Sequence, residues 1–211
     1  SVGQLAILAG LVGARLYEVI FNWDYYGRHP EKIIAVWEGG LAIHGGLIAG
    51  FLTGAILAVK RKLPVLAGLD VAAPSLAIGQ AIGRWGNFFN EEAFGLPTSL
   101  PWKLYISPPH RPLEFGGAEY FHPTFLYESI WNVLVFLFLI GVVRRWSGRR
   151  PGTILFAYVG LYSVGRFLIE AIRLDSFWVL GMRVAQLASV AGVVIAVIGL
   201  SLISPRRAPV P

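Results

Sequence analysis

The stretch GRWGNFFNEEAFG, residues 83–95, combines an arginine, two asparagines and two glutamates with three glycines at the end of an apolar run. Arg84 provides a charge that can pair with an anion, while Asn87 and Asn90 provide directed hydrogen bonds. Glycine lets the backbone turn sharply or approach a ligand closely. An ordinary helix end would need only one glycine and one cation. The stretch therefore indicates a binding site for a polar, anionic group.

A second group of charges lies in GRFLIEAIR, residues 165–173. Arg166, Glu170 and Arg173 are spaced i, i+4, i+7, and this spacing predicts that all three share one face of a helix. One interpretation is an ion pair that only neutralises charge near the membrane surface. The other starts from the two arginines around one glutamate, which leave a positive charge for an external anion. The planar guanidinium suits a phosphate.

The stretch WEGGLAIHGGLIAG, residues 37–50, places His44 inside a predicted glycine-rich helix. Histidine titrates near neutral pH, so His44 is a candidate for moving a proton. The glycines beside it remove side-chain bulk, which permits either close helix packing or space for a ligand. From this segment alone, a structural and a catalytic role for His44 both remain open.

A fourth stretch, HPTFLYES at residues 122–129, also contains several polar side chains. Pro123 suits the start of a helix, and Tyr127 and Glu128 are predicted to point into the helix bundle. Arginines from two helices, a histidine and a glutamate would then converge on an anionic lipid head group. The sequence contains no spacing typical of a metal site. We therefore expect neither a metal nor a cofactor.

The composition identifies the environment in which these residues work. Of the 211 residues, 55% are hydrophobic and 14% are charged, and the mean hydropathy is +0.63, as in a polytopic membrane protein. Cysteine is absent, so any thiol in the chemistry belongs to a substrate. The formal charge is +6, but the basic residues cluster between apolar segments. We therefore expect no nucleic-acid partner.

Six segments are long and apolar enough to span a membrane, and they predict an all-α, polytopic fold. They lie near residues 2–22, 33–58, 66–88, 124–143, 152–172 and 183–203. We expect a single domain over residues 1–211, with residues 89–123 forming a small extracytoplasmic cap. An ionisable residue within a span needs a partner, a wet cavity or a function, and Arg15 is one of several.

Clusters of basic residues predict the orientation, because such clusters mark the cytoplasmic side. Three are present: Lys60 to Lys62, then Arg144, Arg145, Arg149 and Arg150, and finally Arg206 and Arg207. They place the C-terminus in the cytoplasm and the polar stretches toward the outer leaflet. The chain opens in an apolar segment without an initiator methionine. We therefore expect that an N-terminal segment is missing.

Four motifs, in this order, resemble those of the bacterial prolipoprotein diacylglyceryl transferases. They are HGG at 44–46, GRWGNFFNEEAFG at 83–95, HPTFLYE at 122–128 and GRFLIEAIR at 165–173. The family signature G-R-x-G-N-F-x-N-x-E-x-x-G is matched at every fixed position, and the motifs together cover essentially the whole chain. Two features differ: members usually have seven spans with an important tyrosine in the first, and Phe125 stands where other members have glutamine.

The resemblance implies a multi-pass enzyme of the bacterial inner membrane. It would transfer the diacylglyceryl group of phosphatidylglycerol to the lipobox cysteine of a prolipoprotein, forming a thioether and releasing glycerol phosphate. The family's important positions correspond to His44, Arg84, Asn87, Asn90, Glu92, Gly95, Arg166 and Glu170, with Arg15 and Arg173 as further candidates.

A mechanism follows as a hypothesis. His44 acts as the base, Arg84 and Arg166 hold the phosphate, and Glu170 orients Arg166. The glycerol head group is held by Asn87, Asn90, Glu92 and Gly95. His122 is a competing base, and Tyr127 of the same motif is a further candidate site residue. The rival is an anionic-lipid-binding or transport protein that uses the same arginines, although we find no inverted repeat or pair of broken helices.

Overall fold

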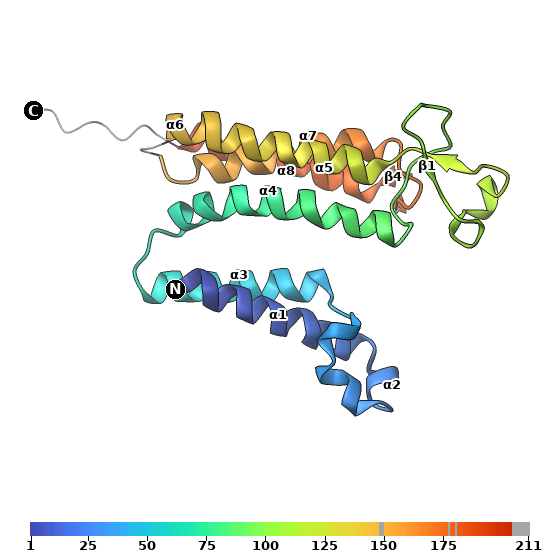
Figure 1. Cartoon of the computed structure of the whole chain (residues 1–211). Helices are drawn as coiled ribbons and strands as arrows, with labels where there is room; N and C mark the ends of the chain where they lie inside the picture. The colour runs from blue at the N-terminus through green and yellow to red at the C-terminus, as the bar shows by residue number, and fades with distance from the viewer. Residues whose placement is uncertain (148–149, 177, 180, 204–211) are drawn as a thin grey trace, which may run out of the picture. The chain divides into compact units, whose positions relative to one another are not determined.

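The computed structural model describes residues 1–147, 150–176, 178–179 and 181–203 (Figure 1). In these ranges, six helical segments are long and apolar enough to cross a membrane, so the predicted polytopic helical fold is confirmed. They are α1 (Val2–Phe21), α3 (Ile43–Lys60), α4 (Val65–Phe89), α5 (Thr124–Phe138) with its π-helical continuation η5 (Leu139–Val143), α7 (Thr153–Glu170) and α8 (Val184–Leu202). The basic residues Arg149, Arg206 and Arg207 lie outside the described residues.

Shorter elements connect the long helices. The helical ones are α2 (Trp23–Tyr26), η1 (Pro30–Ile34), η2 (Val36–Glu38), η3 (Pro108–His110), η4 (Leu113–Phe115) and α6 (Arg144–Ser147). Two antiparallel ribbons pair β1 (Leu104–Tyr105) with β2 (Tyr120–Phe121), and β3 (Trp178–Val179) with β4 (Met182–Arg183). The chain divides into two compact units, Ser1–Gly68 and Leu69–Pro211. A single domain stays a prediction.

In the first unit, α1 and α3 lie side by side and their backbones approach closely (Figure 1). A Cβ atom added to Gly13 would come within 2.7 Å of the carbonyl oxygen of Gly45, and one added to Gly10 within 3.2 Å of that of Gly46. Small residues permit this kind of contact between membrane helices, because they let the main chains meet. The glycine-rich sequence of α3 therefore serves helix packing.

The predicted start of the second span, at residue 33, is wrong. Residues 30–38 form two short 3₁₀ turns, and α3 begins only at Ile43. Between them, Gly39 and Gly40 adopt φ values of 91° and 71°. A right-handed helix cannot run through this left-handed conformation. Glu38 consequently lies before the helix, whereas His44 is the second residue of α3 and so lies at the start of the span.

In the second unit, α4, α5 and α7 pack together around a core of small and branched side chains. Ala73 and Ala77 on α4 are fully buried against a cluster that includes Val135, Leu139 and Ile154. Small alanines on α4 let the bulkier side chains of α5 and α7 fill the space between the helices. This packing brings the polar ends of the three helices together.

Residues 89–123 form a small packed cap with its own apolar core. Phe94, Ile106 and Phe121 are buried there, and the β1–β2 ribbon lies at one end of the unit (Figure 1). The amide of Gly95 donates to the carbonyl oxygen of His122 at 2.9 Å, which ties the cap to the start of α5. These contacts agree with a packed loop, and its role as an extracytoplasmic cap stays a prediction.

Candidate active site

Glu128, on α5, is the centre of an ion-pair cluster in the second unit. Its side chain is buried, and its Oε2 atom lies 2.6 Å from Nε of Arg84 on α4. Its Oε1 atom lies 2.8 Å from Nη1 of Arg166 and 2.8 Å from Nη1 of Arg173. The sequence predicts that Glu128 points into the bundle, but not that it is the common partner of these arginines. The ionisable residue in an apolar helix was the signal that could have found it.

Two further carboxylates complete the cluster. Oε2 of Glu170 lies 2.7 Å from Nη2 of Arg166, and Asp175 accepts two hydrogen bonds from Arg173, at 2.9 and 2.6 Å. Three arginines therefore face three carboxylates, so the surplus positive charge expected around Glu170 is balanced. Burial raises the pKa of the Asp175 carboxyl, but the hydrogen bonds and charge of Arg173 outweigh it and hold that pKa below its ordinary value.

The predicted shared helix face is correct for Arg166 and Glu170 and wrong for Arg173. The helix α7 ends at Glu170, so Arg173 lies in the segment that follows it. It nevertheless reaches Glu128 because this segment is held against the cap, where Leu96 donates to the carbonyl oxygen of Ile172 at 2.8 Å. A tertiary contact replaces the helical register that the spacing predicted.

The arginines of the cluster differ in how many donors they have left. The side chains of Arg84 and Arg166 are 22% and 19% exposed, whereas that of Arg173 is 8% exposed. Nε of Arg84 is close to Glu128 but is not aligned for a hydrogen bond, and its two terminal nitrogens have no hydrogen-bond acceptor within the described part of the chain. Arg84 therefore retains the planar pair of donors that suits a phosphate.

The predicted head-group residues of the first motif form their own cluster at the end of α4. Nδ2 of Asn87 and Nδ2 of Asn90 donate to the same oxygen, Oε1 of Glu92, at 2.9 and 3.2 Å. The chain turns there through Glu91 and Ala93, which have φ values of 49° and 56°. Such values are uncommon for residues with a side chain. The turn returns Glu92 to the two asparagines and leaves the group open to solvent.

Glu91 connects this turn to the cap. Its Oε2 atom accepts hydrogen bonds from the amide of Ser107 at 3.0 Å and from the Ser107 hydroxyl, and it lies 2.9 Å from Nδ1 of His110. The hydrogen bonds from Ser107 are the largest cause that holds the pKa of Glu91 below its ordinary value. Glu91 therefore faces the cap while its neighbour Glu92 faces the asparagines.

His122 and Tyr127 lie together at the start of α5. The Tyr127 hydroxyl lies 3.1 Å from Nδ1 of His122 and accepts a hydrogen bond from Nε1 of Trp102 at 2.9 Å. The side chain of Phe125 is buried, with its ring centroid 5.5 Å from that of Trp85. Phe125 thus fills space beside aromatic rings and supplies no polar group.

Gly95 is surrounded by protein atoms. An added Cβ would lie 2.8 Å from the carbonyl oxygen of Ile172 and 2.9 Å from side-chain atoms of His122 and Thr124. Glycine is needed here because the cap, the start of α5 and the segment after α7 meet at this position. By contrast, a Cβ added at Gly83 or Gly86 would meet no atom within 4 Å. The helix surface beside Arg84 is open.

The remaining predicted residues, Arg15 and His44, lie in the first unit. His44 is exposed near the start of α3, and its ring centroid lies 6.1 Å from that of Tyr17 on α1. Arg15 is buried, and the acceptors of its hydrogen bonds are backbone carbonyl oxygens of residues 32–40. The geometry around Arg15 is that of a structural arginine.

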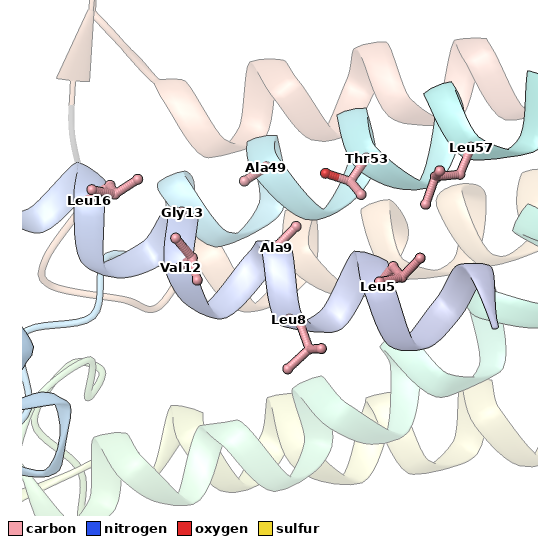
Figure 2. Close-up of a pocket in the computed structure, with 9 residues that line it drawn as sticks. All are labelled: Leu5, Leu8, Ala9, Val12, Gly13, Leu16, Ala49, Thr53 and Leu57. Carbon is pink, nitrogen blue, oxygen red and sulfur yellow. The ribbon is translucent and has the colours of Figure 1, made fainter. Parts of the chain in front are cut away.

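An apolar groove of about 570 Å³ runs between α1 and α3 (Figure 2). It is lined by Leu5, Leu8, Ala9, Val12, Gly13, Leu16, Ala49, Thr53 and Leu57. No charged side chain lines it, so its walls can contact hydrocarbon but cannot bind an anion. The chemistry-bearing residues lie elsewhere.

Comparisons with known proteins agree with the motifs. A family model described as prolipoprotein diacylglyceryl transferase matches residues 2–202. Proteins named phosphatidylglycerol–prolipoprotein diacylglyceryl transferase are similar over nearly the whole chain. That of Trichormus variabilis is 47% identical over 97% of this chain and 74% of its own length. That of Thermosynechococcus vestitus is 47% identical over 97% of this chain and 76% of its own length. That of Parasynechococcus marenigrum is 49% identical over 98% of this chain and 79% of its own length.

Proposed function

The chain belongs to the prolipoprotein diacylglyceryl transferase family, and we propose on that basis that it transfers the diacylglyceryl group of phosphatidylglycerol to the lipobox cysteine of prolipoproteins. This would be the first step of lipoprotein maturation in bacteria. The enzyme would lie in the inner membrane with its C-terminus in the cytoplasm and its active site toward the outer leaflet.

The observation that carries the proposal is the pair of partly exposed arginines around a buried glutamate. Arg84 and Arg166 come from different helices, and Glu128 holds them 2.6 and 2.8 Å from its two oxygens. A single lipid phosphodiester can then be bound by the unused donors of both guanidinium groups. Glu170 would fix the orientation of Arg166, since the two side chains form an i,i+4 ion pair.

The reaction exchanges one bond for another at the glyceryl carbon. The thiol of the acceptor cysteine loses its proton, its sulfur attacks the carbon next to the phosphate ester, and the carbon–oxygen bond breaks. Glycerol phosphate leaves with the electron pair of that bond. Arg84 and Arg166 would stabilise the negative charge that grows on the phosphate. This role needs donors that are in place before the reaction begins.

Proton removal falls to His44 in this proposal. A free cysteine has a pKa of about 8.5, so a base is needed at neutral pH. An exposed imidazole near the start of α3 can accept the proton directly or through water. His122 is the competing base, and its Nδ1 already contacts the Tyr127 hydroxyl.

The glycerol head group would bind at the end of α4. Its hydroxyl groups can donate to the Glu92 carboxylate and accept from the amides of Asn87 and Asn90, which now donate to Glu92. Gly95 would contribute by holding the cap against α5. Arg173, with its donors occupied by Glu128 and Asp175, would support the cluster from behind.

The deciding experiment is transfer in a reconstituted system. The protein is placed in vesicles containing phosphatidylglycerol and given a lipobox peptide with cysteine, or the same peptide with serine in its place. We expect the mass of one diacylglyceryl group to be added to the cysteine peptide alone. Tight binding of the lipid without any product would instead favour an anionic-lipid-binding or transport protein.

The role of Arg84 is tested by Arg84→Ala. We expect more than a tenfold loss of rate, because hydrogen bonds to charged groups contribute about 1.5–3 kcal/mol. The matched control is Arg61→Ala, in the exposed basic cluster after α3, which should keep the wild-type rate. An unchanged rate for Arg84→Ala would remove this residue from the mechanism.

A further inference from the structure

Arg15 makes an unusually complete set of contacts within the first unit. Its Nε donates to the carbonyl oxygen of Ile33 at 2.8 Å, and its Nη1 donates to those of Gly39 and Gly40 at 2.7 and 2.6 Å. Its Nη2 donates to the carbonyl oxygens of Lys32 and Ala35. Every nitrogen of the guanidinium group thus binds the backbone of the segment between α2 and α3, which leaves no open fork for a phosphate.

The backbone around Arg15 is shaped to admit this guanidinium group. Gly40 has a φ of 71°, and an added Cβ would lie 2.6 Å from Nη1 of Arg15 and 2.8 Å from the Tyr26 hydroxyl. The guanidinium carbon of Arg15 lies 5.1 Å from the centre of the Tyr26 ring, within range of a cation–π interaction. The charge is therefore stabilised by carbonyl dipoles and an aromatic face.

The segment that Arg15 holds leads directly into the first turn of α3. The amide of Ala42 donates to the carbonyl oxygen of Ala14 at 3.1 Å, one residue before Arg15. On the other side, Gly45 packs against Gly13 and against the Cβ atom of Tyr17. The residues on both sides of His44 are thus fixed by α1.

The imidazole itself also meets α1. The Tyr17 ring, two residues after Arg15, lies with its centroid 6.1 Å from that of His44. Among the residues described, the His44 imidazole has no hydrogen-bond partner, so its position depends on its backbone and this ring contact. A shift of the 39–42 segment would therefore move the imidazole.

We propose that Arg15 is a positioning residue that acts through His44 and does not bind the lipid phosphate. It holds the carbonyl oxygens of Gly39 and Gly40, and the Ala42 amide binds the neighbouring Ala14, which together set the start of α3 and the place of the imidazole. This inference rests on the proposed function, in which His44 accepts the thiol proton. Loss of the clamp should then slow the chemical step while leaving the binding of phosphatidylglycerol in place.

A double-mutant cycle tests whether Arg15 acts through His44. The transfer assay compares wild type, Arg15→Lys, His44→Ala and the double variant, all with added imidazole as a diffusible base. Lysine keeps the charge but has three donors on one nitrogen, so it cannot span the carbonyl oxygens that arginine binds. We expect Arg15→Lys to lower kcat at least tenfold with KM for phosphatidylglycerol within about twofold of wild type.

In the His44→Ala background, the same lysine substitution should cost no more than about twofold. This non-additivity is the result that a merely structural role would not produce, because general loosening would slow both backgrounds equally. Equal losses in the two backgrounds would overturn the proposal. A large rise in KM would overturn it too, because it would place Arg15 on the phosphate.

Three other outcomes separate this inference from the function on which it rests. No product from the wild-type protein would overturn both. Wild-type rates from His44→Ala, or a failure of imidazole to raise its rate, would remove His44 as the base and the positioning role with it. If the wild-type protein is active but the losses from Arg15→Lys and His44→Ala simply add, the transferase function stands and the positioning role alone is overturned.

A second variant and a second measurement guard against a misfolded Arg15→Lys protein. Gly40→Ala leaves Arg15 unchanged but places a Cβ against its guanidinium group. We expect its loss of rate to be non-additive with that of His44→Ala, as for Arg15→Lys. Hydrogen exchange at residues 39–42 should become faster by tenfold or more in both variants. The control Arg28→Lys, in an exposed part of the same segment, should keep wild-type exchange and activity. Unchanged exchange in Arg15→Lys would overturn the clamp.

Discussion

Arg15 and Arg84 are both arginines in apolar helices, but their donors meet different partners. Every guanidinium nitrogen of Arg15 is bound by backbone carbonyl oxygens. Arg84 instead approaches one carboxylate through Nε and keeps its terminal nitrogens unoccupied in the described part of the chain. Burial alone does not separate a structural arginine from one available to a ligand. The number of donors left after folding does.

The two environments also neutralise charge differently. Around Arg15, neutral carbonyl dipoles converge on one cation, so the arrangement depends on the local backbone. Around Arg84, the charges of three arginines and three carboxylates cancel, so removing one member leaves a buried charge without its partner. An anion can enter the second arrangement by taking unused donors, whereas the first would have to break backbone hydrogen bonds.

The largest effect that we predict is for Glu128→Ala. Three arginines would lose their common partner, and breaking a buried ion pair typically costs about 3–5 kcal/mol. We expect a loss of this size in the free energy of unfolding in detergent, together with loss of transfer. Glu128→Gln should fall between this variant and wild type. A Glu128→Ala protein as stable as wild type would show that the cluster does not hold the helix ends together.

The next prediction separates the two kinds of arginine by anion binding. Glycerol phosphate at ten times its dissociation constant should stabilise the wild-type protein by about 1.4 kcal/mol, seen as a rise in melting temperature. We expect the rise to be lost in Arg166→Gln and retained in Arg15→Lys. Stabilisation that disappeared in Arg15→Lys and persisted in Arg166→Gln would contradict the assignment of the anion to Arg166.

Asp70 offers a carboxylate whose partners are backbone amides instead of arginines. Its oxygens accept hydrogen bonds from the amides of Gly152 and Leu155 at 2.7 and 2.8 Å, at the start of α7. We expect Asp70→Asn to lower the free energy of unfolding by about 1 kcal/mol, as for loss of a helix cap. The transfer rate, measured on the folded fraction, should stay within twofold of wild type. A large loss of activity in the folded Asp70→Asn protein would show that Asp70 does more than cap the start of α7.

The smallest expected effect concerns Glu91, whose carboxylate binds Ser107 and His110 in the cap. Because these contacts lower its pKa below the ordinary value of 4.5, they stabilise the fold above that pH and are lost as the pH falls through the lowered pKa. Glu91→Gln should therefore melt slightly below wild type at neutral pH. The two melting curves should converge in acid, and a gap that widened in acid would contradict the assignment.

Much of this arrangement could be predicted from sequence. The spans α4 and α8 lie within a residue of their predicted limits. Asn87, Asn90 and Glu92, which the mechanism assigns together to the head group, share one cluster. The predictions failed where a distant residue decided the outcome. The second span was predicted to begin ten residues too early, because hydropathy does not register the φ values of Gly39 and Gly40 or the carbonyl oxygens that Arg15 binds.

The sequence by itself determined that this is a helical membrane protein, which residues carry charge into its apolar helices, and which family it belongs to. These properties are local, because hydropathy, helical periodicity and motif spacing can be read from neighbouring residues. Only the tertiary structure decided that Glu128 joins arginines 38 and 45 residues further along the chain, and that Arg15 binds the backbone. Ion pairs depend on distance in space, and the packing of the helices and of the cap sets which distant side chains meet.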